Sequence, residues 1–203
     1  MKRSLYLIIA MLCAVSVVLG YQDLSRGIDL YNARKYAEAV RALQTVVESQ
    51  SDNAEAQTYL GLAYIATGNI GEARAALQRA EELAPNSDAV KVGQARVAIE
   101  GQQFDMAEAA LQRAAEINEG NPDVALYRGA LRVAQRNYQA AVNELNEAIA
   151  RKRNNPYAYY YIGLAYNGLK RPDKVVESFE TFLKLAPDAP EAERVKSLLR
   201  SVR

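Results

Sequence analysis

The 203-residue sequence predicts an all-α protein in which one helix-turn-helix unit is repeated five times. Two observations predict this class: small residues recur every 34 residues, and apolar residues recur at helical spacing within each copy. The fixed spacing is plainest in the row formed by Ala39, Ala73, Ala107, Ala141 and Val175. A period of this length is typical of solenoids, in which each unit packs mainly on its neighbours.

Each repeat contains two amphipathic helices separated by a short polar break. In the second repeat, Leu60, Ala63 and Tyr64 recur at helical spacing, residues 67–69 interrupt the pattern, and a second apolar stripe follows. Proline is tolerated at a first helical position, where its missing N–H costs nothing, so Pro122 marks a helix start. The five repeats follow one another without insertion and begin near residues 20, 54, 88, 122 and 156.

The recurring residues match a known pattern best in the second and fifth repeats. The matching residues are Leu60, Gly61, Tyr64, Gly68, Ala73, Leu77, Ala80 and Pro85, then Tyr159, Ile162, Gly163, Tyr166, Phe179 and Pro187. This pattern resembles the tetratricopeptide repeat (TPR), and the resemblance covers residues 20–189. It departs from the family in lacking Trp at the fourth position of every repeat. The resemblance implies a right-handed superhelical solenoid whose concave groove is lined by the first helices.

The last fourteen residues predict a capping helix. A solenoid needs a terminal element that covers the apolar end of its last repeat. In residues 190–202, Val195, Leu198 and Leu199 form an apolar side, and charged residues occupy the rest. We therefore expect residues 21–203 to form a TPR domain that ends in this helix.

Residues 1–20 have the pattern of an export signal. Lys2 and Arg3 precede an apolar stretch of 15 residues, Leu5–Leu19, and a membrane-spanning helix needs about 20. Small residues at Val18 and Gly20 predict cleavage after Gly20. The sequence therefore predicts a periplasmic bacterial protein. The alternative is that the segment is retained as an anchor in the inner membrane.

The composition argues against most catalytic chemistry. The chain has no His, and its single cysteine, Cys13, lies inside the apolar N-terminal stretch. Intrachain disulfides, Cys/His zinc sites and His-based triads are therefore excluded, and no Gly-rich phosphate loop is present. Because 25 basic residues balance 24 acidic ones, nucleic acid is not indicated. We expect a non-enzymatic protein with no cofactor, metal or small-molecule substrate.

The family resemblance places the groove at the second, fifth, ninth and twelfth positions of each first helix. An apolar groove suits an amphipathic helix or an extended apolar segment of another protein. The same aliphatic residues could instead pack neighbouring first helices together. The candidate partner-binding residues are Tyr21, Leu24, Ile28, Tyr31, Thr58, Leu62, Ile65, Val92, Arg96, Leu126, Tyr157, Tyr160, Leu164 and Asn167.

The densest aromatic patch lies at the start of the fifth repeat. Tyr157, Tyr159, Tyr160 and Tyr161 cannot all face inward, because successive helical residues point about 100° apart. We expect Tyr159 to pack in the interior, while Tyr157 and Tyr160 face the groove, where tyrosines often dominate binding energy. The alternative is that all four only fill core and surface positions.

Arg128 and Arg132 occupy a helix face that is apolar in other repeats. Arginine can lay its stem on apolar residues and extend its head to water. Alternatively, the two residues form a polar seam between repeats three and four that holds an acidic group of a partner.

These expectations define a function class without naming a partner. The sequence predicts a protein–protein interaction scaffold or adaptor of the cell envelope, which binds a partner segment in its groove. The alternative is a signal-anchored inner-membrane TPR protein that organises a membrane-bound assembly, so membrane association depends on whether residues 1–20 are retained.

Overall fold

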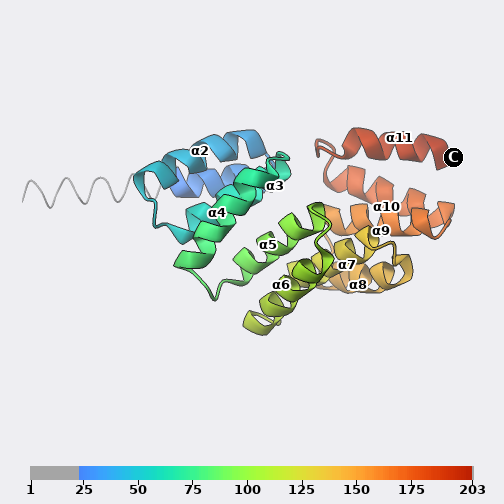
Figure 1. The fold of residues 1–203 in the computed structure, drawn as a ribbon. Helices are drawn as coiled ribbons and strands as arrows, with labels where there is room; N and C mark the ends of the chain where they lie inside the picture. Colours follow the sequence, from blue (N-terminus) through green and yellow to red (C-terminus); the bar gives the residue numbers. More distant parts are fainter. Residues whose placement is uncertain (1–22, 203) are drawn as a thin grey trace, which may run out of the picture. The chain divides into compact units, whose positions relative to one another are not determined.

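The computed structural model describes residues 23–202, and every regular element in this range is an α-helix (Figure 1). The predicted export signal, residues 1–20, lies outside the described residues. Residues 23–32 form the described part of the first helix. The later helices are α2 (Tyr36–Ser49), α3 (Ala54–Ala66), α4 (Ile70–Leu83), α5 (Asp88–Glu100), α6 (Phe104–Ile117), α7 (Pro122–Ala134), α8 (Tyr138–Arg151), α9 (Pro156–Gly168), α10 (Pro172–Leu185) and α11 (Ala192–Val202).

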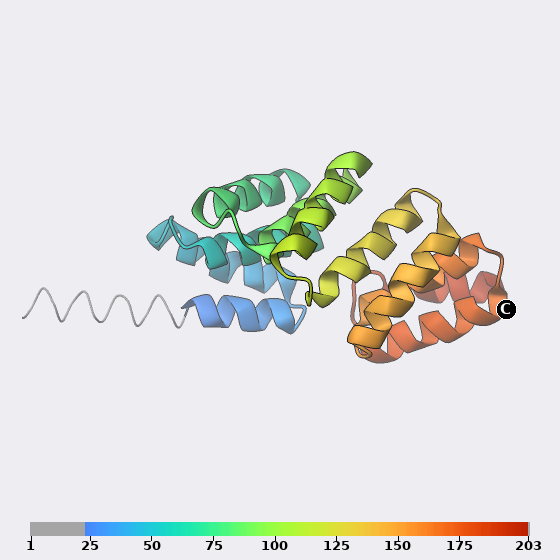
Figure 2. The same cartoon turned by 90° about the horizontal axis from the view of Figure 1, so that it is seen from below.

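Consecutive helices form antiparallel pairs, as both views of the ribbon show (Figures 1 and 2). The most extensive contacts join α3 to α4, α5 to α6, α7 to α8 and α9 to α10. The first helices of these pairs begin at residues 54, 88, 122 and 156, which are the predicted repeat starts. The predicted all-α repeat fold is therefore confirmed. Within residues 23–202, no helix is both long enough and apolar enough to cross a membrane.

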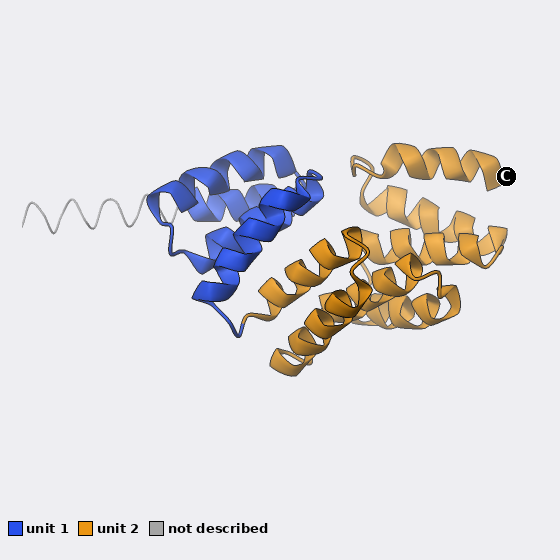
Figure 3. Cartoon of the chain, in the orientation of Figure 1, with its two compact units in different colours: residues 1–86 blue, residues 87–203 orange. Residues whose placement is uncertain are grey.

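The chain divides into two compact units, residues 1–86 and residues 87–203 (Figure 3). In the first unit, α3 packs against α2 and α4. In the second unit, α5 to α10 form three successive pairs, and α11 packs on α10. The boundary between the units follows Asn86, at the end of the second repeat. The TPR domain over residues 21–203 stays a prediction.

Side chains at the N-termini fix where the first helices start. The side chains of Asn53, Asn121 and Asn155 accept hydrogen bonds from backbone N–H groups in the first turns of α3, α7 and α9, at 2.9, 2.8 and 3.1 Å. Each bond satisfies one of the donors that a helix start leaves free. Proline follows the cap in α7 and α9, as predicted for Pro122.

In each repeat, the fifteenth residue lies in the turn between the two helices and has a left-handed backbone conformation, with positive φ. In the second repeat this residue is Gly68, with φ of 79°. The other repeats place Arg34, Gln102, Arg136 and Lys170 there, with φ between 55° and 61°. Because Cβ disfavours this conformation, these four turns carry strain that the glycine turn avoids.

Close approach within the pairs depends on glycine in the first helix. A Cβ atom added at Gly129 would lie 2.4 Å from Leu145, and one at Gly163 would lie 2.4 Å from Phe179. These distances are too short for real contacts, so each glycine makes room for the large side chain of its partner helix. Leu145 and Phe179 are fully buried as a result.

The last pair is closed by α11. Val195 and Leu199 of α11 are buried in one cluster with Phe179 and Phe182 of α10. Leu198, the third apolar residue expected on this side, is half-buried against the same cluster. The helix therefore covers the apolar side that α10 would otherwise expose.

Candidate functional site

We call the side of α5, α7 and α9 that carries the second, fifth, ninth and twelfth positions of their repeats the first-helix face. Within the second unit, α5 contacts α7, and α7 contacts α9. The structure therefore brings the predicted groove residues of repeats three, four and five onto neighbouring helices. The corresponding residues of repeats one and two lie in the first unit.

The fifth position is a packing position in every repeat. Its residues are all buried, with exposed fractions of 2–7%. They are Leu24, Thr58, Val92, Leu126 and Tyr160. Of the two interpretations that the sequence left open for the groove rows, burial favours packing for this row. These five residues offer no free surface to a partner.

Tyr160 corrects the expectation that its side chain faces an open groove. Its ring centroid lies 5.4 Å from that of Phe182 and 5.2 Å from that of Tyr161. It shares its cluster with Val195 of α11, so the terminal helix helps to enclose the ring. Burial raises the pKa of Tyr160, which keeps its phenol neutral in the folded protein.

The remaining groove candidates retain accessible surface. Asn167 is exposed, and Tyr21 lies outside the described residues. The others are half-buried, as expected for residues that both pack and present an edge. They are Ile28, Tyr31, Leu62, Ile65, Arg96, Tyr157 and Leu164.

The chemical centre of the first-helix face in the second unit is formed by Arg96, Tyr127 and Tyr161. The Arg96 guanidinium lies over the Tyr127 ring, 5.0 Å from its centroid, in a cation–π contact. Arg96 and Glu100 of α5 both act electrostatically on Tyr161 of α9, whose pKa is raised by burial. The face thus combines aromatic rings, a guanidinium and a carboxylate, which can bind both apolar and polar parts of a peptide.

Tyr127 and Tyr161 were absent from the sequence-based candidates, although the sequence contains a signal for them. Both occupy the sixth position of their repeats, and Tyr59 occupies the same position in the second repeat. In the first unit, Tyr59 makes an edge contact with Tyr31 at 5.6 Å. A row of three tyrosines spaced by multiples of 34 residues would have identified this position.

Tyr157 and Tyr159, the other two tyrosines of the aromatic patch, are half-buried, and their hydroxyls bond to different groups. The Tyr157 hydroxyl donates to Glu191 at 3.4 Å, and its ring lies 6.3 Å from that of Phe182. The Tyr159 hydroxyl donates to the backbone carbonyl of Arg153 at 3.0 Å. Tyr159 packs partly against the terminal cluster but is not the interior residue that we expected.

Arg128 and Arg132 contact acidic and amide side chains of the same chain. Arg132 Nη2 lies 2.9 Å from Glu108 Oε2 of α6, and Arg128 Nη2 donates to Gln112 Oε1 at 3.3 Å. These four residues, with Glu144 of α8, are called the polar seam below. Among the described residues, the acidic group beside Arg132 is Glu108. That the seam holds an acidic group of a partner stays a prediction.

The polar seam is partly desolvated. Burial raises the pKa of Glu144, while the nearby guanidinium groups of Arg128 and Arg132 act in the opposite direction. Arg128 Nε is buried and has no hydrogen-bond partner among the described residues. Burying such a group without a partner costs stability, so this seam is less well satisfied than an apolar contact would be.

The described residues contain no group of three His, Cys, Asp or Glu side chains placed to hold a metal ion. The geometry instead defines a helical repeat protein with a mixed aromatic and charged surface. Family models of the tetratricopeptide repeat match residues 24–88 and 128–190, and a second model of the same repeat matches residues 68–131. The chain therefore belongs to the tetratricopeptide repeat family, whose members are protein-interaction scaffolds.

Several solved structures share the fold. A thermophilic TPR protein of Thermus thermophilus is 16% identical with a TM-score of 0.74, covering 90% of this chain and 98% of the other. The APC/C hetero-tetramer Cut9–Hcn1 is 17% identical with a TM-score of 0.75, and the match covers 90% of this chain and 36% of the other. YrrB, a TPR protein with an unusual peptide-binding site, is 19% identical with a TM-score of 0.50, and the match covers 86% of this chain and 90% of the other. No curated protein matches the sequence significantly.

Proposed function

We propose that the protein is a non-enzymatic scaffold or adaptor that binds a segment of another protein on the first-helix face of its second unit. The observation that carries this proposal is the group formed by Arg96, Tyr127 and Tyr161, with the half-buried side chains of Tyr157 and Leu164 on α9. Aromatic residues and arginine are the side chains that most often dominate protein interfaces.

The chemistry of this face favours an amphipathic or apolar peptide segment. Leu164 and the aromatic rings can cover apolar side chains, while Arg96 and Glu100 can pair with polar groups of the same segment. The peptide-binding site named for the structurally similar YrrB supports a peptide as the type of ligand. Catalysis, a cofactor and a small-molecule substrate have no part in the proposal.

We further propose that the protein acts in the cell envelope after export. The support is the charged and apolar pattern of residues 1–20. The expected mature N-terminus is Tyr21 in a soluble periplasmic fraction, which N-terminal sequencing would show. A membrane-bound chain that retains residues 1–20 would instead favour the anchored alternative, in which the protein organises an assembly at the inner membrane.

The binding face is tested by paired variants. The double change Arg96→Ala with Leu164→Ala should reduce partner recovery from envelope extract at least about tenfold, which corresponds to roughly 1.4 kcal/mol. Its melting temperature should stay close to that of the parent protein, because both side chains are only half-buried.

Tyr160→Ala is the matched control because Tyr160 lies on the same side of α9 but is buried. This change should destabilise the second unit by about 3–5 kcal/mol, as large aromatic truncations in cores do. The folded fraction should nevertheless recover the same partners. If the double variant recovered partners at full strength, the first-helix face would not be the binding surface.

A further inference from the structure

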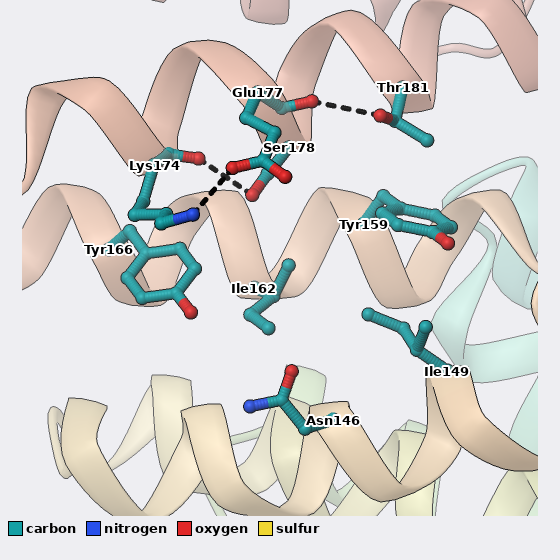
Figure 4. Close-up of a pocket in the computed structure, with 9 residues that line it drawn as sticks. All are labelled: Asn146, Ile149, Tyr159, Ile162, Tyr166, Lys174, Glu177, Ser178 and Thr181. Carbon is teal, nitrogen blue, oxygen red and sulfur yellow. Dashed lines mark hydrogen bonds and ion pairs between the residues drawn. The ribbon is translucent and has the colours of Figure 1, made fainter.

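A cavity of about 330 Å³ lies between α8, α9 and α10 of the second unit (Figure 4). Its floor is α9, where Tyr159, Ile162 and Tyr166 lie in line. These residues point to a different side of α9 from Tyr160 and Leu164, because successive helical residues turn by about 100°. The cavity, called the outer cavity below, is therefore separate from the first-helix face.

The lining of the outer cavity combines an apolar floor with an acceptor-rich rim. Ile149 of α8 provides apolar surface, Ile162 is buried at the base of the cavity, and Asn146 and Glu177 lie on opposite rims. The rim hydroxyls of Ser178 and Thr181 donate to backbone carbonyls of α10 at 2.7 and 2.9 Å, which leaves their oxygens able to accept.

The ammonium group of Lys174 lies at the edge of this cavity. Lys174 Nζ donates to Glu177 Oε2 at 2.7 Å, and this carboxylate raises the pKa of Lys174. Both side chains are substantially exposed, at 42% and 67%, so the pair can open at little cost. The rim therefore favours a positive charge, and another cation can replace Lys174 beside Glu177.

The repeat register shows what fills this space one repeat earlier. Ile162 corresponds to Arg128 and Tyr166 to Arg132, each displaced by 34 residues, and Asn146 corresponds to Gln112. In the polar seam, the two arginine heads bond to Gln112 and Glu108 across the groove between α6 and α7. In the groove between α8 and α9, Ile162 and Tyr166 stand in place of these two arginines, and the outer cavity lies there.

We propose that the outer cavity binds an arginine side chain presented by a partner protein. The aliphatic stem would lie on Ile149, as arginine stems commonly cover apolar surface. The guanidinium would stack against the rings of Tyr159 or Tyr166 and pair with Glu177. Arginine fits better than lysine because its planar fork can stack and bind two acceptors at once.

Nuclear magnetic resonance titration of the full chain tests this proposal with N-acetyl-arginine amide as the probe. Saturable shifts are expected at the side chain of Asn146 and at the rings of Tyr159 and Tyr166. The matched probe is N-acetyl-citrulline amide, which has nearly the same shape but no charge. It should bind at least about fivefold more weakly, because it loses the charge-assisted bond to Glu177. Equal binding of the two probes, or no saturable shift with arginine, would overturn the proposal.

Three variants separate an arginine site from other uses of the cavity. Glu177→Gln should weaken arginine binding about fivefold or more, whereas Lys174→Met should strengthen it by removing the competing cation. Ile162→Arg places an arginine where Arg128 stands in the previous repeat and should abolish binding. If Lys174→Met weakened arginine binding instead, Lys174 would not be competing for Glu177 and the proposal would be wrong.

These results do not depend on the first-helix face. Failure of the arginine titration would leave the effect of Arg96→Ala and Leu164→Ala on partner recovery unchanged. Conversely, loss of the proposed peptide interaction would not alter the shifts at Asn146 and Tyr166. Melting curves of all three variants would show whether the second unit remains folded, as expected for changes at Lys174 and Glu177, which are largely exposed.

Discussion

The polar seam and the outer cavity occupy equivalent grooves of consecutive repeats, and the chain fills them differently. In the seam, Arg128 and Arg132 cross the groove and bond to Gln112 and Glu108. In the cavity, Ile162 and Tyr166 leave an open space of about 330 Å³. The same backbone arrangement therefore supports one groove filled by the chain's own arginines and one that is unfilled, and the difference is confined to a few side chains.

The two grooves also differ in what holds their repeats together. The fourth repeat depends partly on ion pairs and on the half-satisfied Arg128. The fifth repeat depends on the apolar cluster of Phe179 and Phe182, which is completed by Val195 of α11. Variants that attack each source of stability separately can therefore break or sharpen the comparison.

Removing residues 190–203 should produce the largest effect. The deletion uncovers the cluster under α11, and Val195 and Leu199 alone contribute about 1.5–3 kcal/mol each when buried. Because repeats couple mainly to neighbours, hydrogen exchange should accelerate more in residues 156–185 than in residues 122–151. Equal protection in both repeats would show that α11 does not stabilise the fifth repeat. Arg200→Ala, an exposed change on the same helix, should have almost no effect.

A double-mutant cycle should reveal the ionic contribution to the polar seam. Arg132→Met and Glu108→Gln should show a coupling free energy of about 0.5–1 kcal/mol at low salt, and this value should shrink at high salt. The Lys174–Glu177 pair is the matched control, since it is more exposed and should couple by about 0.2–0.5 kcal/mol. Denaturant unfolding measures both cycles. Identical couplings would remove the distinction between the two grooves.

Glu144 should make the seam sensitive to pH. Burial raises the pKa of Glu144 above its unfolded value of 4.5, so the folded state binds the proton more tightly. The resulting stability is fully present below pH 4.5 and is lost as pH rises through the raised pKa. Glu144→Gln, which stays uncharged, should lack this loss and should be the more stable protein near neutral pH. Parallel unfolding curves for both proteins across this range would contradict the prediction.

The turns should show the smallest effect and no difference between the two repeats. Arg136→Gly and Lys170→Gly should each stabilise the protein by about 0.5 kcal/mol, because glycine relieves the left-handed strain but costs unfolded-state entropy. Gly68→Ala is the reciprocal control and should destabilise. Thermal unfolding measures all three. Unequal gains at Arg136 and Lys170 would show that the difference between the grooves extends into the turns.

The sequence predicts the fold well because the 34-residue register fixes the order of the helices. The same register places the groove positions but cannot separate packing from binding, since aliphatic residues serve both purposes. Leu126 and Leu164 look alike in sequence, yet one is buried and the other is half-buried. The burial of Tyr160 depends on how α11 folds back, and the partner of Arg132 depends on which side chain α6 places opposite it.

The outer surface of α11 has a consequence for how copies of the protein meet. Its exposed residues include Glu193, Arg194, Lys196 and Arg200, all charged, while its apolar side is turned toward α10. Repeat arrays that end in an uncovered apolar helix can stack end to end into filaments. A charged terminal helix opposes such stacking, because each contact would have to desolvate charges without gaining apolar burial. The charged outer side of α11 is therefore unsuited to apolar contacts between copies.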